Sequence, residues 1–283
     1  MLAKSCFKIS GIIQNESYFT FHEGNSVDLD KIHDVLTGQL LGTVFHNALP
    51  AAESKTIANN FWNSEISRKQ NDGVPAISVG AYHYKKDLVE YFKQVELAKP
   101  HVTNLFHGTI NIVEPFIEKL TTYFEKKNVC FRAASHDNRE ASKFVIRSCN
   151  AFSDFVISPH DDIAQCTMKS QRGFEIEKIP NYEMIAVNMC LENHNGGQLH
   201  IWNMQPDNET RSSLNIEETG YPYPPNLVNE FNEIIMPIRT GDLYCFNGRN
   251  IHAVKSKIKS DKYRTTITFF MGYIDSKTII YWT

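Results

Sequence analysis

The sequence lacks the patterns that mark several common classes of protein. Its six cysteines show no CxxC spacing, which argues against a disulfide scaffold or a zinc site and favours buried free thiols in a reducing compartment. No apolar run approaches the roughly 20 residues of a membrane span, and the N-terminus lacks the sustained apolar segment of a signal peptide. We therefore expect a soluble, cytoplasmic protein that does not bind membranes.

The sequence also lacks an excess of one charge. Its 29 basic and 32 acidic residues are interspersed and give a net charge of −3, which argues against a nucleic-acid partner. A basic cluster at 255–262 is interpreted as a solvated hairpin loop. Neither a GxSxG nucleophile motif nor a phosphate-binding glycine loop is present. These absences leave a small-molecule partner as the expectation and say nothing about the oligomeric state.

The patterns that are present divide the chain into two parts. We expect one domain over residues 1–283, in which 1–128 are mainly helical support and 129–283 form a β-rich core. Aromatic residues make up 12% of the chain, which favours a well-filled, strand-rich core. Apolar residues at helical spacing predict helices from Ser26 or Asp28 to Gly42, from Pro50 through Trp62, from 86 to 99, and from 112 to 126. In the third of these, Pro100 is expected to stop the helix, and Val89 is expected to face inward.

Short β-prone runs separated by turn residues follow from about residue 129. They include 144–147, 184–190, 243–246 and 265–270. The turn signal at 193–197 predicts that 198–202 returns beside 184–190 as a hairpin. Helices followed by such strands predict an α+β fold, a double-stranded β-helix (jelly roll) buttressed by N-terminal helices. The polar stretch between Asn203 and Pro237 is either a lid over a site or a surface excursion.

Two histidines and an aspartate form the most informative pattern. His160 and Asp162 lie two residues apart at the end of a strand-like run, so both side chains can reach one metal ion. His252 follows on what we take to be a non-adjacent strand that returns across the barrel mouth. Two imidazoles and one carboxylate are the ligands of a mononuclear non-haem Fe(II) site with open positions. A His-x-Asp pair alone would arise by chance among 11 histidines and 32 acidic residues, so the interpretation depends on its context.

An arginine twelve residues after His252 supplies that context. If 254–262 form a loop between antiparallel strands, Arg264 returns to the same mouth as His252. A guanidinium there can bind the distal carboxylate of 2-oxoglutarate through two hydrogen bonds. The hydroxyl of Thr265 or Thr266 can add a further hydrogen bond, and the sequence does not say which of the two faces inward.

These segments resemble the 2-oxoglutarate/Fe(II) oxygenase superfamily. The resemblance rests on GGQLHIWN (196–203), FNGRNIHAV (246–254), RTTITFF (264–270) and the final IYWT, and it covers roughly the last 140 residues. More narrowly, the chain resembles the branch that contains the welwitindolinone-type aliphatic halogenases and the free amino-acid halogenases with their hydroxylase relatives. The resemblance implies the jelly roll, Fe(II), O₂ and 2-oxoglutarate as a cosubstrate.

The resemblance also bears on the reaction. Halogenases of that branch have Gly or Ala where this chain has Asp162, and the vacant position lets chloride bind iron. A carboxylate at that position implies hydroxylation of an unactivated C–H bond in an amino acid or specialised metabolite, with succinate and CO₂ as coproducts. Two alternatives stay open: an aliphatic halogenase that tolerates the carboxylate, and a non-catalytic jelly-roll binding protein.

Further residues are weaker candidates. Arg147 is a candidate for binding the cosubstrate or a substrate carboxylate, or it is a surface arginine. Asp161 is expected to face solvent, because a strand turns it away from Asp162. Candidates for contacting the substrate are His83, His136, Trp202 and Asn203, although core filling is the commoner fate of such aromatic residues.

Overall fold

The computed structural model describes residues 8–65, 76–149, 154–193, 196–256 and 264–283. Within these ranges, no helix is long and apolar enough to cross a membrane. The α-helices are α1 (Leu29–Leu36), α2 (Ala51–Trp62), α3 (Leu88–Asn104), α4 (Val113–Glu125), α5 (Asn208–Ser213) and α6 (Pro225–Val228). Three 3₁₀ helices, η1 (Ala164–Thr167), η2 (Lys169–Gln171) and η3 (Glu175–Asn181), connect the strands in the middle of the chain.

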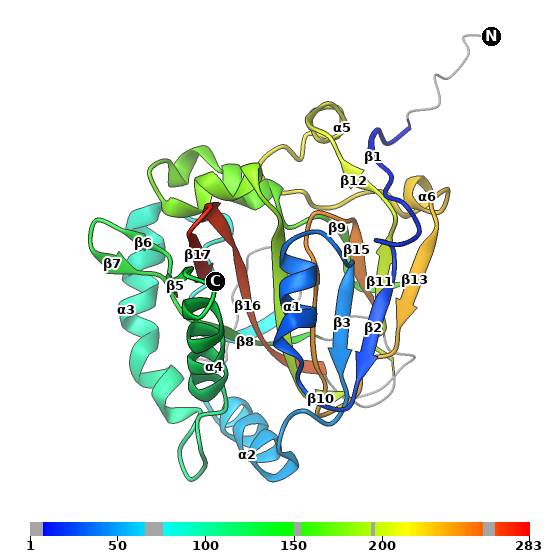
Figure 1. The fold of residues 1–283 in the computed structure, drawn as a ribbon. Helices are drawn as coiled ribbons and strands as arrows, with labels where there is room; N and C mark the ends of the chain where they lie inside the picture. Colours follow the sequence, from blue (N-terminus) through cyan, green and yellow to red (C-terminus); the bar gives the residue numbers. More distant parts are fainter. Residues whose placement is uncertain (1–7, 66–75, 150–153, 194–195, 257–263) are drawn as a thin grey trace, which may run out of the picture.

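A large sheet forms the centre of the molecule (Figure 1). Its main path runs through β2 (Phe21–Gly24), β3 (Gly42–Phe45), β14 (Leu243–Asn247), β10 (Met184–Asn193), β16 (Arg264–Asp275), β17 (Thr278–Trp282) and β5 (Cys130–Ala133). The first half of β16 pairs with β8 (Val145–Cys149), which in turn pairs with β4 (Ala76–Val79). Three of these strands, β2, β3 and β4, come from the part of the chain for which only helices were predicted.

A smaller sheet faces the large one. Its order is β13 (Glu233–Met236), β11 (Leu199–Trp202), β15 (His252–Lys255) and β9 (Phe155–His160). The predicted hairpin of 184–190 with 198–202 is therefore wrong. Both edges of β10 are occupied, by β14 and β16, so β11 pairs with β13 and β15 instead. Two short ladders complete the strands: β1 (Gly11–Ile12) with β12 (Gln205–Pro206), and β6 (Ser135–His136) with β7 (Arg139–Glu140).

The alternation of side chains along β10 separates the core into two layers. Ile185 and Val187 pack in the cluster that includes the buried residues of α1, α2 and α4. Ala186 and Cys190 point the other way and pack with residues of the small sheet, such as Leu199. This period of two is what an extended strand imposes, and it assigns one face of the large sheet to the helices and the other to the small sheet. The described strands thus form two facing sheets rather than one closed barrel.

The four N-terminal helices occur where helical periodicity was seen, with two differences in α3. The Asp28 carboxylate caps α1 by accepting from the backbone N–H of Asp30 at 2.9 Å. However, α3 continues through Pro100 instead of stopping there, and Val89 is 74% exposed. Pro100 lies on the exposed side of the helix, where water can satisfy the backbone carbonyl that the proline leaves without a donor.

The cysteines of the described residues form no disulfide bonds. Four are buried, Cys149, Cys166, Cys190 and Cys245, as predicted. Cys130 is also free, but it is exposed at the start of β5, so the prediction of burial fails there. Cys6 lies outside the described residues.

Candidate active site

The predicted metal ligands lie together at the inner face of the small sheet. His160 ends β9, Asp162 lies in the turn that follows, and His252 begins β15. The Nε2 atom of His252 is 3.3 Å from Oδ2 of Asp162, and Nε2 of His160 is 3.7 Å from Oδ1. Each of the three residues offers one possible ligand atom, and these three atoms lie within 4.8 Å of one another. Among the described residues, this is the group of three His, Cys, Asp or Glu side chains that could hold a metal ion.

The strand that carries His252 differs from the prediction. β15 is the direct antiparallel neighbour of β9, and His252 stands opposite His160 in the ladder. The expected return on a non-adjacent strand is therefore wrong. Cross-strand neighbours have their side chains close together, and the two imidazole rings lie 4.1 Å apart between centroids.

Backbone carbonyl groups fix the orientation of both imidazoles. Nδ1 of His160 lies 2.8 Å from the carbonyl oxygen of Ser158, and Nδ1 of His252 lies 2.9 Å from that of Asn250. Because a carbonyl oxygen only accepts, each Nδ1 carries the proton and donates it. Each Nε2 therefore faces Asp162 as the ring nitrogen left for a metal ion, which is the arrangement of metal-binding histidines whose other nitrogen is held by a carbonyl.

Asp162 is held by two contacts of its own. Its backbone N–H donates to the carbonyl of Gly248 at 2.8 Å, and its Oδ1 accepts a hydrogen bond from Nε2 of Gln165 at 3.0 Å. Gln165 is in turn fixed, because its Oε1 accepts from the hydroxyl of Tyr82 at 2.7 Å. The carboxylate is thus oriented before any metal binds.

The pKa shifts differ among the three side chains of the cluster. Burial lowers the pKa of His160 to about 3, so this imidazole is neutral. Burial raises the pKa of Asp162, but the two neighbouring imidazoles outweigh burial and the net shift is downward. Burial lowers the pKa of His252, but the Asp162 carboxylate reverses that effect. Two imidazoles and an ionised carboxylate fit the donor set of a non-haem Fe(II) site.

A narrow cavity connects this cluster to Arg264 of the large sheet. Its walls include Asn188, Tyr244, Thr266 and Thr268. Arg264 is only 6% exposed and donates to the Tyr244 hydroxyl, but its buried Nε has no hydrogen-bond partner among the described residues. An unpartnered buried guanidinium nitrogen is costly, and a bound carboxylate would satisfy it. The cavity therefore fits a 2-oxo acid with one end at the metal ligands and the distal carboxylate at Arg264.

The structure also distinguishes the two threonines after Arg264. Thr266 lines the cavity, whereas Thr265 points to the opposite face and donates to Oε1 of Glu192 at 2.5 Å. The predicted hairpin between β15 and β16 is wrong, because the two strands belong to different sheets. Of the proposed loop 254–262, Val254 and Lys255 belong to β15, and residues 257–262 lie outside the described residues. Arg264 reaches the cavity of His252 because the two sheets face each other.

A second cavity adjoins His160 and Asp162. It is lined by Tyr82, Tyr84, Arg147, Ile157, Gln165, Thr219 and Tyr221. Arg147 lines both cavities, and its guanidinium lies 5.0 Å above the ring of Tyr82. Tyr82 stacks on Tyr84 with 5.8 Å between ring centroids. The tyrosines were not predicted, because their spacing in the sequence gives no sign that they meet.

Asp161 contradicts its prediction. It is completely buried, and its carboxylate accepts hydrogen bonds from Arg211, Tyr223 and the backbone of Ala164. The prediction assumed that the strand continues through Asp162. Because β9 ends at His160, Asp161 lies in a turn and its side chain enters the protein instead of facing solvent.

The remaining predicted substrate residues do not line either cavity. His83 is buried, with Nδ1 2.9 Å from Oε1 of Gln171. His136 belongs to the β6–β7 hairpin, and its Nδ1 lies 3.0 Å from the carbonyl oxygen of Gly173. Trp202 packs in a separate core cluster, and Asn203 exchanges hydrogen bonds with the backbone of Gln14. Core filling, the alternative given for the aromatic residues, describes the position of Trp202.

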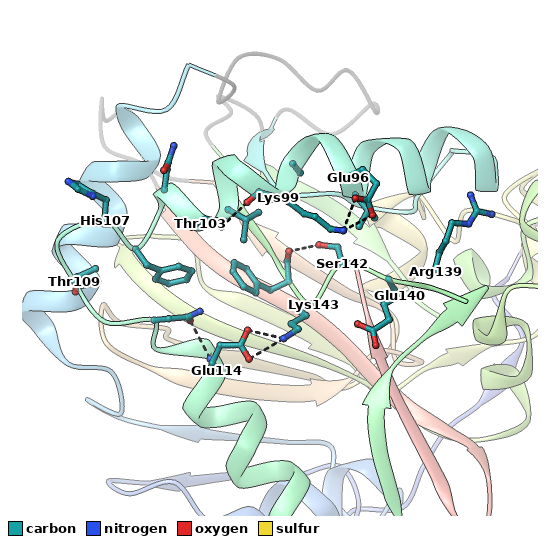
Figure 2. A pocket seen from close by; sticks show the side chains of 18 of the residues that line it. Glu96, Lys99, Thr103, His107, Thr109, Glu114, Arg139, Glu140, Ser142 and Lys143 are labelled. Carbon is teal, nitrogen blue, oxygen red and sulfur yellow. Dashed lines mark hydrogen bonds and ion pairs between the residues drawn. The ribbon is translucent and has the colours of Figure 1, made fainter. Parts of the chain in front are cut away.

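A larger cavity lies elsewhere, between α3, the loop that follows it and residues 138–144 (Figure 2). Two of its lysines are paired: Lys143 with Glu114 at 2.9 Å, and Lys99 with Glu96 at 2.6 Å. It shares no residue with the two cavities at His160. Although this cavity is larger, it is therefore not a candidate for the site of a reaction at the metal ligands.

Comparisons with known proteins find similarity over most of the chain. Residues 20–283 match the family model of the carrier-protein-independent halogenase WelO5. L-isoleucine 3(1)-dioxygenase of Pantoea ananatis (strain AJ13355) is 30% identical over 260 residues, which cover 88% of this chain and 86% of that protein. The similarity extends well beyond the last 140 residues, where the sequence resemblance was recognised.

Solved structures share the fold. An N-substituted L-amino acid dioxygenase from Burkholderia ambifaria AMMD superimposes with a TM-score of 0.56 at 16% identity, covering 89% of this chain and 90% of that one. A second structure of this kind from the same organism, in complex with α-ketoglutarate, gives a TM-score of 0.52 at 15% identity and covers 90% of both chains. The arrangement of two facing sheets is therefore the jelly-roll fold of these oxygenases.

Proposed function

The chain belongs to the family of the carrier-protein-independent halogenase WelO5, and we propose that, unlike that halogenase, it hydroxylates a free amino acid or a closely related small molecule. Its enzyme class is that of the Fe(II)- and 2-oxoglutarate-dependent dioxygenases. The proposal concerns the reaction outcome, the substrate and the role of each residue.

The position of Asp162 is the observation that carries the proposal. Its carboxylate lies between the two Nε2 atoms, at 3.3 and 3.7 Å, where it can act as the third protein ligand. The family resemblance implies that halogenases have Gly or Ala here, so that a halide takes the vacant place. With the carboxylate present, that place is filled by the protein, which favours hydroxyl transfer to the substrate.

The residues around the two cavities have distinct proposed roles. His160, Asp162 and His252 hold Fe(II), which with 2-oxoglutarate and O₂ supplies the oxidising power for C–H hydroxylation. Arg264 and Thr266 orient the distal carboxylate of 2-oxoglutarate, and the carbonyl groups of Ser158 and Asn250 keep both imidazoles in the ligating tautomer. The buried walls exclude water from the reacting centre.

The second cavity is the proposed substrate site. It adjoins His160 and Asp162, and its tyrosines offer flat apolar surfaces for an aliphatic side chain. Arg147, which lies in the wall between the two cavities, is suited to pair with the carboxylate of an amino acid. The relative named L-isoleucine 3(1)-dioxygenase supports an aliphatic amino acid as the first substrate to try.

The test is a product assay that distinguishes hydroxylation, halogenation and iron binding without catalysis. The protein with Fe(II) and 2-oxoglutarate is supplied with L-isoleucine and the other common L-amino acids, in chloride and in chloride-free buffer, and products are identified by mass spectrometry. We expect a mass increase of one oxygen that does not depend on chloride. A chlorinated product would favour the halogenase alternative, and folded protein that binds iron without oxidising 2-oxoglutarate would favour a binding protein.

The variant Asp162→Gly sharpens the test. We expect hydroxylation to fall at least about 100-fold, because a metal ligand is removed at the reacting centre. Asp154→Gly is the matched control, since Asp154 is an exposed aspartate just before β9. Unchanged hydroxylation by Asp162→Gly would show that Asp162 is not a ligand.

A further inference from the structure

Residues 207–223, here called the strap, lie against the turn that carries Asp162. The strap contains α5 and the loop after it, and it brings Thr219 and Tyr221 to the wall of the proposed substrate cavity. The ring of Tyr221 meets the imidazole of His160 edge-on, with 5.9 Å between centroids and 69° between planes. A segment some 50 residues away in sequence thus supplies part of the proposed substrate site.

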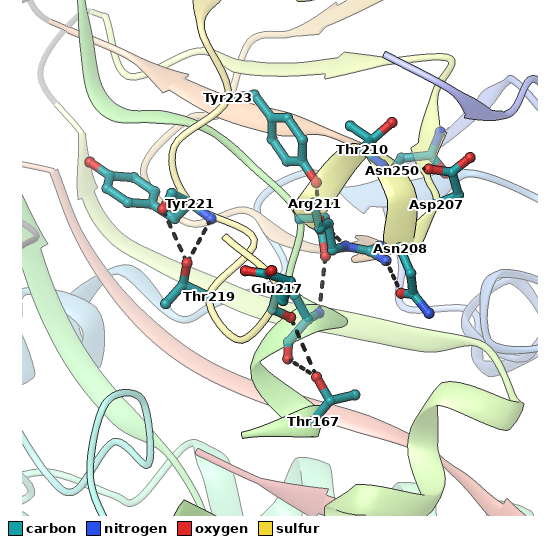
Figure 3. A network of polar contacts seen from close by, with 12 residues as sticks. Thr167, Asp207, Asn208, Thr210, Arg211, Glu217, Thr219, Tyr221, Tyr223 and Asn250 are labelled. Atoms are coloured by element: carbon teal, nitrogen blue, oxygen red, sulfur yellow. Dashed lines mark hydrogen bonds and ion pairs between the residues drawn. The ribbon is translucent and has the colours of Figure 1, made fainter. Parts of the chain in front are cut away.

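The strap is attached through a buried ionic cluster centred on Asp161. Figure 3 labels Arg211 and Tyr223, the two strap residues that contact this aspartate. Oδ2 of Asp161 accepts from Nε of Arg211 at 3.0 Å and from the hydroxyl of Tyr223 at 2.6 Å. The side chain of Asp161 is fully buried, and that of Arg211 is 9% exposed. Charges this deeply buried require one another, since removal of one partner leaves the other without compensation.

Backbone contacts join the strap to the same turn. The N–H of Asp161 donates to the carbonyl of Gly220 at 3.0 Å, and the N–H of Tyr223 donates to the carbonyl of Pro159 at 2.8 Å. Gly220 has a φ of +59°, and a Cβ atom there would lie 2.4 Å from the carbonyl oxygen of Asp161. A side chain is excluded at this point because the two backbones are already in contact.

The two cavities differ in their dependence on the strap. The substrate cavity includes Thr219 and Tyr221, whereas no strap residue lines the cavity that leads to Arg264. A loosened strap would therefore disturb one cavity and leave the other intact. An effect on the substrate cavity alone would therefore indicate that the strap positions residues of that cavity. An effect on both cavities would indicate that the strap only contributes to the stability of the protein.

We propose that Asp161 is a positioning residue that, through Arg211 and Tyr223, fixes the strap and so places Tyr221 beside the reacting centre in contact with the substrate. The part that concerns substrate contact rests on the proposed function. The attachment of the strap does not, because it follows from the contacts of Asp161 alone.

The experiment compares Tyr223→Phe with the matched control Tyr123→Phe. Both changes remove a tyrosine hydroxyl that donates to an aspartate, but Tyr123 donates to Asp30 between α4 and α1, on the helix-covered side of the large sheet. Hydrogen exchange measured by mass spectrometry on the whole protein reports the opening of residues 207–223. Steady-state kinetics with the best amino acid of the panel gives KM separately for that substrate and for 2-oxoglutarate. Arg211→Lys, which keeps the charge, is the conservative variant.

We expect Tyr223→Phe to speed exchange within the strap about 10-fold, the effect of losing one hydrogen bond to a charged group. The KM for the amino acid should rise by a similar factor, while the KM for 2-oxoglutarate changes less than about twofold. Arg211→Lys, which keeps the charge, should have a smaller effect than the double variant Tyr223→Phe/Arg211→Met, which removes both partners of Asp161. Tyr123→Phe should change none of these values.

Three results would overturn the proposal. Unchanged exchange in the strap would show that the cluster does not hold it. A parallel rise in both KM values would show a merely structural role, and faster exchange with neither KM altered would remove the strap from the substrate site. Failure to oxidise any amino acid of the panel would contradict the proposed function instead, and the exchange result would still decide whether Asp161 holds the strap.

Discussion

At the scale of single residues, the site depends on side chains whose polar atoms are already oriented. Each imidazole donates its Nδ1 proton to a carbonyl, Asp162 accepts from Gln165, and Arg264 donates to Tyr244 while its Nε keeps a free donor. Such orientation lowers the entropy that binding would otherwise cost. A small number of rigid groups therefore defines where metal and cosubstrate fit.

Arg264→Met should weaken binding of 2-oxoglutarate. The guanidinium is the buried cation at the far end of its cavity, and a hydrogen bond to a charged group is worth about 1.5–3 kcal/mol. We expect the KM for 2-oxoglutarate to rise about 10- to 100-fold, measured from the rate of succinate formation. The control Arg239→Met removes an exposed arginine and should leave that KM unchanged. Equal effects of the two variants would refute the role of Arg264.

The sequence predicted the residues of the site that lie in a recognisable order. His160, Asp162, His252 and Arg264 were found because metal and carboxylate chemistry requires those residue types, and the structure brings them together. Asp161 was missed because its prediction depended on where β9 ends. One residue more or less of strand decides whether a side chain faces solvent or the interior.

At the scale of elements, Gly197, which precedes β11, leaves room for Arg264 in the wall of its cavity. Gly197 has a φ of +65°, and a Cβ atom there would lie 2.7 Å from Cδ of Arg264. The glycine was predicted to serve a hairpin turn, but β11 belongs to the other sheet. Its second role, leaving room for the arginine, depends on a contact that the sequence pattern does not contain.

Gly197→Ala should therefore impair 2-oxoglutarate binding as well as stability. Gly108→Ala is a matched control, because Gly108 has a similar φ of +71° but no atom within 4 Å of the new Cβ. Both variants should lose about 1 kcal/mol of folding free energy through backbone strain. Only Gly197→Ala should raise the KM for 2-oxoglutarate. If the two variants behave alike in kinetics, the contact with Arg264 is irrelevant.

The junction of β5 with η3 predicts a pH dependence of stability. Glu175 accepts hydrogen bonds from both terminal nitrogens of Arg132, at 2.6 and 2.7 Å, and from the N–H of Ser135 at 2.7 Å. Burial raises the pKa of Glu175, but these donors outweigh burial and hold it below its ordinary value of 4.5. A lowered pKa in the folded state means that the stabilisation is present above about pH 4.5 and is lost as the pH falls below it.

Glu175→Gln should lower the free energy of unfolding by about 1 kcal/mol at pH 7, a modest value because Arg132 is partly exposed to solvent. The difference from the natural protein should shrink as the pH falls below 4.5, measured by urea denaturation. Glu96→Gln, which breaks an exposed pair with Lys99, should have little effect at either pH. A constant difference across the pH range would show that the charge of Glu175 is unimportant.

At the scale of the whole molecule, the site forms where the two sheets face each other. His160 and His252 come from the small sheet, whereas Arg264 and Thr266 come from the large one. Helices α1, α2 and α4 cover the other face of the large sheet and leave this face to the site (Figure 1). The site therefore depends on the packing of the two sheets against each other, and no single element contains it.

The overall architecture was predictable in class but not in strand pairing. Short β-prone runs indicated the strands, and the turn residues indicated where they end. A β-prone run does not specify its neighbour, however, so β10 was paired with β11 instead of β14 and β16. The strands β2, β3 and β4 were missed because four-residue runs carry little periodicity.

The most direct test of the account is an anaerobic titration of the protein with Fe(II) and 2-oxoglutarate, following the visible charge-transfer band of the chelate. We predict a saturable band that is absent in His160→Ala and His252→Ala but present in His136→Ala, whose histidine lies on the β6–β7 hairpin. A folded protein that shows no band, or a band that survives both ligand substitutions, would contradict the assignment of the iron site.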